Sequence, residues 1–249
     1  MNYSVALACF NGQEFILDQL SSIITSFSYA QIEDFEIIVS DDGSKDQTVD
    51  LVRSLNDKRI FILKGPKLGL IKNFENALRH CSGDIIFLSD QDDVWFESKV
   101  KNCLAILEDS DLVLSDAIVV DRNLLVLNNS FFNLNGSRPG AIKNLIKNSY
   151  LGCGLAFKRN VLNLALPFPK SIPMHDWWIG LIAESMYKVG YIYSPLFYYR
   201  RHGGNASVTS EKSQYPLSTK LKWRAKLLIA LIFRLVHFFV INLKAVFNK

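Results

Sequence analysis

An apolar run passes directly into three carboxylates within one short segment, Ile85-Ile86-Phe87-Leu88-Ser89-Asp90-Gln91-Asp92-Asp93-Val94-Trp95. Carboxylates packed this closely raise one another's pKa, so a cation or a set of hydrogen-bond donors must compensate them if all are to stay ionised. Oxygen ligands of this kind select Mg²⁺ or Mn²⁺, and Mg²⁺ sites are usually completed by water and substrate phosphate oxygens. The segment therefore predicts a metal ion bound together with a diphosphate. The alternative is an acidic loop that only caps a helix beginning near Phe96.

Strands and helices alternate on the N-terminal side of this segment. Short apolar runs predict strands over residues 3–9, 35–40, 59–63 and 84–88. Apolar residues at helical spacing predict helices between them, over residues 16–27, 47–55 and 70–79. Such alternation is typical of βαβ units with right-handed crossovers. We therefore expect an α/β fold in which a mostly parallel sheet is flanked by helices.

A polar cluster follows each of these strands. Asn11-Gly12 comes after the first strand, Asp41-Asp42-Gly43-Ser44 after the second, Lys64-Gly65-Pro66-Lys67 after the third, and the acidic segment after the fourth. Open α/β sheets bind ligands at the carboxyl ends of their strands, so we expect these clusters to share one edge and to form a site there. The turns expected at the opposite edge, Asp57-Lys58 and Ser82-Gly83, are plainer.

The alternation loosens after Ser110. A strand is predicted over residues 111–116 and another over 192–199, whereas residues 128–140 are rich in Asn, Gly and Pro and predict a loop. We predict one α/β domain over residues 1–210, with a nucleotide-binding half at 1–116 and an acceptor half at 117–210. A separate tail over residues 211–249 follows.

The composition indicates a globular chain, because 249 residues with 49% hydrophobic content are enough for a packed core. The cysteines stand far apart among apolar residues and show no metal-type spacing, so we expect reduced core residues at Cys9, Cys81, Cys103 and Cys153. The first residues show neither a basic region nor a small-residue cleavage site, so a signal peptide is not expected.

The tail is both basic and apolar. Residues 212–249 hold eight of the 28 basic residues and none of the 24 acidic residues, in a chain of net charge +4. The apolar run of 17 residues from Leu227 to Leu243 is near the lower limit for a membrane span, and Arg234 and His237 in its middle would be costly in lipid. We predict an amphipathic helix that lies on the membrane surface, with anionic headgroups bound by Lys220, Lys222, Arg224 and Lys226.

The alternative for this tail is a helix packed on the domain or on a second subunit, since an apolar helix must be buried somewhere. The interleaving of basic and apolar residues favours a membrane over nucleic acid as the partner. The protein is accordingly expected in the cytoplasm, peripheral to the inner face of the cytoplasmic membrane.

Several motifs occur in a fixed order along the chain. They are Ala8-Cys9-Phe10-Asn11-Gly12, Ser40-Asp41-Asp42-Gly43-Ser44, Ser82-Gly83-Asp84 leading to the acidic segment, Gly152-Cys153-Gly154, His175-Asp176-Trp177-Trp178 and Tyr199-Arg200-Arg201-His202-Gly203. With their strand and helix contexts they make residues 3–205 resemble the family 2 glycosyltransferases of GT-A fold, a Rossmann-like α/β fold. The resemblance is strongest to the bacterial rhamnosyltransferase-like members.

The resemblance implies a site for a nucleotide-diphosphate sugar donor. Phe10, Asn11 and Asp42 would hold the nucleotide base, and Asp90 would reach the ribose. Asn73, in the turn that opens the predicted helix at residues 70–79, is a further candidate for nucleotide contact.

The resemblance also implies a metal site for Mg²⁺ or Mn²⁺. Asp92 would bind the ion that bridges the two phosphates, with Asp93 behind it or capping the next helix. Arg200 would contact the pyrophosphate, and His202 would ligate the metal or donate to the leaving group. The alternative for the last two is a basic loop that faces anionic lipid beside the tail.

Asp176 is the candidate catalytic base. It stands near the N-terminus of a predicted helix, so helix capping is the alternative for this residue. Within the His-Asp-Trp-Trp motif, the resemblance assigns it the removal of a proton from the acceptor hydroxyl. His175 would orient Asp176 or simply pack, and Trp177 and Trp178 would stack on a sugar or lie in the core.

Together these features predict an inverting, metal-dependent glycosyltransferase that moves rhamnose or a related hexose to a lipid-linked saccharide, as in O-antigen or capsule assembly. A sugar nucleotidyltransferase is one alternative, but it should carry a Gly-rich phosphate loop after the first strand, and residues 10–14 do not form one. A non-catalytic, membrane-bound carbohydrate-binding module is the other alternative.

Overall fold

The computed structural model describes residues 2–202 and 216–247, with side chains in the last helix described as far as residue 240. Its first four strands are β1 (Tyr3–Cys9), β2 (Phe35–Asp41), β3 (Ile60–Lys64) and β4 (Ile85–Ser89). They pair in parallel in the order β3-β2-β1-β4. The helices between them are α1 (Ile16–Tyr29), α2 (Thr48–Ser54) and α3 (Leu70–His80). The parallel α/β unit predicted from the alternating pattern is therefore confirmed.

The two faces of this sheet are covered by different helices. β4 lies on the other side of β1 from β2 and β3. Right-handed crossovers therefore place α3 on one face and α1 and α2 on the other. The strand order reverses between β1 and β4, and the carboxyl ends of the strands at such a reversal are the usual ligand site of these sheets.

Beyond β4 the sheet becomes mixed. β8 (Leu155–Lys158) lies antiparallel between β4 and β6 (Leu112–Val120), and β9 (Val189–Arg200) runs parallel to β6. The short strands β5 (Val94–Trp95) and β7 (Val126–Asn128) pair antiparallel with β9 and β6. The one continuous sheet carries strands from both predicted halves of the domain, and the division at residue 116 stays a prediction.

The connections in this second part are short helices. They are α4 (Lys99–Leu107), α5 (Phe131–Asn135), α6 (Ala141–Ile146), the 3₁₀ turn η1 (Gly152–Gly154), α7 (Arg159–Ala165) and α8 (His175–Met186). The loop predicted over residues 128–140 contains α5, which begins at a Ser130 cap on the amide of Asn133 and ends at Gly136 in the left-handed region (φ 65°). A helix of five residues is too short to show a helical period in the sequence.

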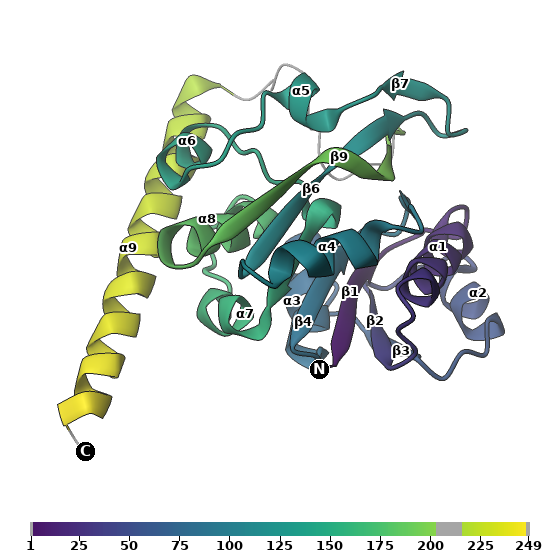
Figure 1. Ribbon diagram of the computed structural model, residues 1–249, viewed down its shortest axis with the longest axis horizontal. Coiled ribbons are helices and arrows are strands. Elements are labelled where there is room, and N and C mark those ends of the chain that lie inside the picture. The colour runs from purple at the N-terminus through teal and green to yellow at the C-terminus, as the bar shows by residue number, and fades with distance from the viewer. Residues whose placement is uncertain (1, 203–215, 248–249) are drawn as a thin grey trace.

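The long helix α9 (Leu217–Phe247) runs along one side of the molecule and extends past the other elements (Figure 1). It packs on α6 and α8, burying Leu227 and Leu231. Arg234 donates to the carbonyls of Leu164 (2.6 Å) and Leu166 (2.7 Å) after α7, and its guanidinium lies over the Trp178 ring. One side of α9 is therefore packed on the domain, which explains how Arg234 is accommodated within an apolar run.

The rest of α9 presents large apolar side chains to solvent, namely Leu228, Ile229, Ile232, Phe233, Val236, Phe239 and Val240. Within residues 2–202 and 216–247, none of the helices combines the length and the hydropathy that crossing a membrane requires.

Candidate active site

The loops after β1 and β4 are joined by Gln91. Its side-chain oxygen accepts from the amide of Phe10 (2.8 Å), and its side-chain nitrogen donates to the carbonyl of the same residue (3.1 Å). A Cβ at Gly12 would collide with the end of the Gln91 side chain, which would have to move away from the Phe10 main chain. Gln91 was not among the predicted site residues, although its place inside the acidic segment was an available signal.

The loop after β2 is built around Asp41 and Asn11. Asp41 accepts from the amides of Gly43 and Ser44 (both 3.1 Å), and the Ser44 hydroxyl accepts from the amide of Asn11 (2.8 Å). Asp42 accepts from the amides of Leu68 (3.3 Å) and Gly69 (2.8 Å), where the chain enters α3. The loops after β1, β2 and β3 thus form one rim, as predicted.

Two predicted nucleotide contacts differ sharply in exposure. Phe10 presents half of its side chain to solvent at this rim (51% exposed), as a residue that stacks on a base requires. Asn73 is only 2% exposed, and its side-chain amide donates to the carbonyls of Ser40 (2.8 Å) and Cys9 (3.2 Å). Asn73 therefore ties β1 to β2 beneath the rim and is shielded from a ligand, so the expected nucleotide contact does not agree with its position.

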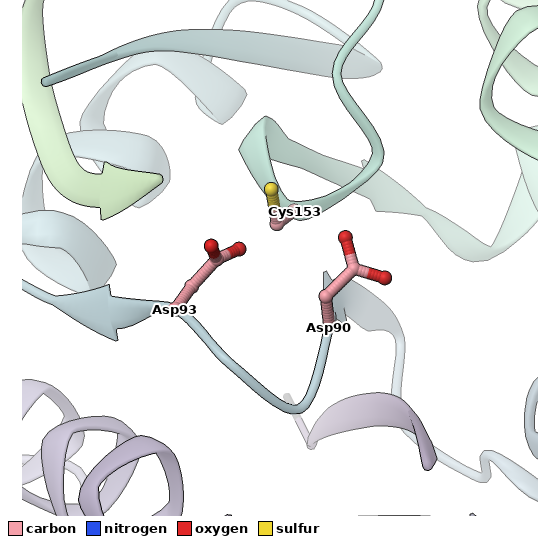
Figure 2. Close-up of side chains that lie close together, drawn as sticks. All are labelled: Asp90, Asp93 and Cys153. Carbon is pink, nitrogen blue, oxygen red and sulfur yellow. The ribbon is translucent and has the colours of Figure 1, made fainter. Parts of the chain in front are cut away.

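Figure 2 shows Asp90 and Asp93 converging with Cys153 of η1. Their ligand atoms all lie within 4.8 Å of one another. Burial and the charges of Asp93, Asp92 and Asp176 raise the pKa of Asp90 well above its usual value. Burial and the charge of Asp92 raise the pKa of Asp93 to about 7. Cys153 is a free, buried thiol, as predicted, but it faces the carboxylates as well as the core.

These residues fit a divalent cation. Asp93 is fully buried, and its Oδ2 has no hydrogen-bond partner among the described residues. Buried oxygens of this kind are normally satisfied, and a bound ion commonly accounts for one that is not. Carboxylate oxygens are the ligands that Mg²⁺ and Mn²⁺ prefer.

Asp92 and His202 meet on the outer side of the same loop, with His202 Nε2 2.8 Å from Asp92 Oδ2. The structure thus brings together the two residues that were predicted from the sequence to be metal ligands, and their role as ligands stays a prediction.

Arg200 stabilises the acidic loop through hydrogen bonds to Asp92 and Asp93. It is 4% exposed, its Nε donates to the carbonyl of Asp92 (2.8 Å), and its amide donates to the Asp93 carboxylate (3.1 Å). The guanidinium also donates to the carbonyl of Arg122 (2.6 Å). These contacts hold the loop in shape, and a contact of Arg200 with pyrophosphate stays a prediction.

Asp176 lies in the first turn of α8 and is buried (7% exposed). Its carboxylate accepts from the amide of Trp177 (2.6 Å). Burial raises the pKa of Asp176 to about 7, although the backbone amides of Trp177 and Gly152 oppose this. The charge of Asp176 is also one of the causes that raise the pKa of Asp90.

The neighbours of Asp176 in the motif are packing residues. The ring of His175 stacks on Phe74 with 4.0 Å between centroids, and burial lowers the pKa of His175 to about 3, so it is neutral. The indole nitrogens of Trp177 and Trp178 donate to the carbonyls of Asn144 (2.7 Å) and Ala165 (2.9 Å). Both tryptophans therefore belong to the core.

Residues 4–163 match the family described as Glycosyl transferase family 2. The chain belongs to this family. Membership confirms the resemblance seen in the motifs and favours glycosyl transfer over the two alternative functions. This chain is similar to two bacterial relatives and to two solved structures, among others.

The first relative is the UDP-Glc:alpha-D-GlcNAc-diphosphoundecaprenol beta-1,3-glucosyltransferase WfaP of Escherichia coli, which is 25% identical over 224 residues, 88% of this chain and 85% of that protein. The second is the dTDP-rhamnosyl transferase RfbG of Shigella flexneri, which is 27% identical over 234 residues, 80% of this chain and 72% of that protein.

Two solved structures share the fold of this glycosyltransferase. S. aureus TarS 1–349 in complex with UDP-GlcNAc superposes with a TM-score of 0.66 and 21% identity, over 87% of this chain and 62% of that chain. A mannosyltransferase from Pyrobaculum calidifontis in complex with GDP-Man and Mn²⁺ superposes with a TM-score of 0.57 and 20% identity, over 94% of this chain and 64% of that chain. This chain thus spans less than two thirds of either solved chain. At these identities the likeness establishes the GT-A type of fold alone.

Proposed function

We propose that this family 2 glycosyltransferase is an inverting, metal-dependent enzyme that uses a nucleotide-diphosphate sugar. The observation that supports this most directly is the convergence of Asp176 with Asp90. Asp176 lies in the first turn of α8 and Asp90 directly follows β4, yet the turn Gly152–Gly154 lies against both. The ligand atoms of Cys153 and Asp90 lie within 4.8 Å of each other, and a Cβ at Gly152 would lie 3.7 Å from the Cβ of Asp176. A base and a diphosphate site in one environment are what an in-line sugar transfer requires.

In this proposal the donor lies on the rim formed by the loops after β1, β2 and β3 and beside the acidic loop that follows β4. The exposed ring of Phe10 contacts the nucleotide base, with Asn11 and Asp42 shaping the pocket beside it. Asp90 faces the ribose. Asp92, Asp93 and His202 supply ligands for Mg²⁺ or Mn²⁺ at the diphosphate, with Arg200 holding their loop.

The chemistry assigned to the chain is a single displacement. Asp176 accepts the proton of the acceptor hydroxyl, and the acceptor oxygen attacks the anomeric carbon on the face opposite the diphosphate. One bond forms as the other breaks, so the anomeric configuration inverts and no covalent sugar–enzyme intermediate is needed. When bound, the divalent cation neutralises charge on the departing diphosphate. A carboxyl with a pKa of about 7 suits a general base at neutral pH.

The donor sugar is proposed to be rhamnose from dTDP-rhamnose or a related hexose. RfbG is named for dTDP-rhamnosyl transfer and WfaP for transfer from UDP-glucose, so both donors belong in the test. Purified protein with Mn²⁺ should release nucleoside diphosphate from one member of a panel containing dTDP-rhamnose, UDP-glucose, UDP-GlcNAc and GDP-mannose. Release from none of them, together with no calorimetric binding of UDP, dTDP or GDP, would contradict the proposed function.

The acceptor is proposed to be a lipid-linked saccharide at the cytoplasmic face of the membrane, as part of bacterial surface polysaccharide synthesis. WfaP is named for a diphosphoundecaprenol acceptor. In α9, the exposed apolar side chains from Leu228 to Val240 follow the basic residues Lys220, Lys222, Arg224 and Lys226. Apolar and basic groups on one helix favour contact with an anionic membrane surface.

A vesicle flotation assay tests this contact. The wild-type protein should float with vesicles that contain an anionic phospholipid and less so at high salt. Replacing both Ile232 and Phe233, which are 52% and 73% exposed, by serine should weaken binding by about 10²-fold because apolar burial in the membrane is lost. The matched control is Ile142→Ser on α6, a residue 77% exposed, which should float like wild type. Equal flotation of all three proteins would rule out α9 as the membrane contact.

A further inference from the structure

Lys99 is the first residue of α4, and it is completely buried (0% exposed). Burying a lysine costs free energy unless its charge is compensated, and a cation in the first turn of a helix is also disfavoured by the helix dipole. Lys101, two residues later on the same helix, is exposed to solvent, as most lysines are. The burial of Lys99 therefore requires an explanation.

The ammonium group of Lys99 occupies a defined position between two aromatic rings and one carbonyl. Its Nζ lies 3.9 Å from the centre of the Phe197 ring and 4.8 Å from that of Trp95. It donates a hydrogen bond of 2.7 Å to the main-chain carbonyl of Cys153. Cation–π contacts and a buried hydrogen bond are the interactions that compensate a desolvated ammonium group.

The carbonyl that Lys99 holds belongs to the turn Gly152–Gly154, which lies between the acidic cluster and the proposed base. On one side of the turn, the thiol of Cys153 faces Asp90 and Asp93 (Figure 2). On the other side, a Cβ at Gly152 would lie 3.7 Å from the Cβ of Asp176, and the amide of Gly152 favours the ionised form of that carboxyl.

A turn of this kind needs support because two of its three residues are glycine, which has few steric restrictions. Without Lys99, the Cys153 carbonyl would lose its buried donor, which is costly enough to displace the turn. We propose that Lys99 is a positioning residue that fixes the Gly152–Gly154 turn and thereby holds Asp176 in register with the acidic cluster. This inference rests on the proposed function of Asp176 as the base.

The test compares Lys99→Met with wild type, and Lys101→Met is the matched control. Methionine keeps an unbranched apolar stem between the two rings but cannot donate to the carbonyl. We expect Lys99→Met to lower kcat by about 10²-fold, because small displacements of reacting groups have effects of this size. The affinity for the nucleoside diphosphate among UDP, dTDP and GDP that wild type binds most tightly should stay near the wild-type value. Lys101→Met should match wild type in both measurements.

A carboxyl titration provides a readout independent of turnover. In metal-free protein with ¹³C-labelled aspartate, NMR reports the pKa of Asp176, assigned by the resonance that is missing in Asp176→Asn. Lys99→Met should raise this pKa because the amide of Gly152 no longer favours the ionised form. A merely structural role for Lys99 would lower the thermal midpoint of unfolding without moving this pKa.

Wild-type kcat and an unchanged pKa of Asp176 in folded Lys99→Met would overturn the proposal. If Lys99→Met does not fold, Gly152→Ala disturbs the same turn with Lys99 intact, since the added Cβ would lie 3.2 Å from Nε2 of His175. This variant should then show the loss of kcat and the raised pKa, and wild-type behaviour would reject the role of the turn. A wild-type protein inactive on every donor would count against the proposed function, whereas the titration would still decide the role of Lys99.

Discussion

Replacing Asp176 by asparagine is expected to lower kcat for sugar transfer by about 10²–10⁴-fold, the usual contribution of a general base. Asparagine has the same shape, and its oxygen can still accept from the amide of Trp177, so α8 should keep its structure. It cannot take a proton from the acceptor hydroxyl. Nucleoside diphosphate binding, measured by calorimetry, should be nearly unchanged because the rim that holds the donor is built by other loops.

The matched control is Asp109→Asn, an exposed carboxylate just after α4. This variant should transfer sugar at the wild-type rate. If Asp176→Asn turned over as fast as Asp109→Asn, Asp176 would not be the base.

The pH dependence of the wild-type enzyme follows from the same carboxyl. The proposed base would be active when ionised, and burial raises the pKa of Asp176 to about 7. The value of kcat/KM should therefore fall by about tenfold per pH unit below this pKa and level off above it. In Asp176→Asn this limb should disappear from the residual rate.

Removing the metal is expected to have the second large effect. Chelation with EDTA should abolish transfer, and added Mn²⁺ or Mg²⁺ should restore it, because the diphosphate leaving group would otherwise depart without charge compensation. Asp92→Asn and Asp93→Asn should each weaken Mn²⁺ binding, measured by electron paramagnetic resonance, by at least about 10–100-fold, the effect known for groups that only support ligands.

Asp109→Asn again serves as the control and should bind Mn²⁺ like wild type. A loss of binding in both variants would support the proposed ligands Asp92, Asp93 and His202. A loss confined to Asp92→Asn would assign the ion to Asp92 and His202, whereas a loss confined to Asp93→Asn would assign it to the cluster with Asp90 and Cys153. Full transfer in the presence of EDTA would contradict metal dependence altogether.

From the sequence we could predict the first half of the fold and the loops that form the rim. Alternating apolar periods at residues 3–88 predicted four parallel strands with helices between them, since burial of a strand or a helix face leaves a local repeat in the chain. Polar clusters after these strands predicted the shared rim, because the direction of parallel strands places their ends together. The ordered motifs predicted the family.

The residues beneath that rim could be placed only from the three-dimensional structure. The antiparallel entry of β8 between β4 and β6 depends on pairing between distant segments, which no local period records. The position of β8 also places η1 beside Asp90 and Asp93. Because this pairing leaves no local signal, the sequence predicted only a core position for Cys153. The position of Asn73 in the chain suggested a nucleotide contact, yet its side-chain amide donates to main-chain carbonyls of β1 and β2.

Two basic residues show the physical reason most clearly. Lys99 lies in the first turn of α4 and Arg234 lies within an apolar run, and each is a charge that needs compensation when buried. In the fold each meets main-chain carbonyls and an aromatic ring supplied from far along the chain. Local sequence determines which groups must be compensated, and only the packing of distant segments decides which partners compensate them.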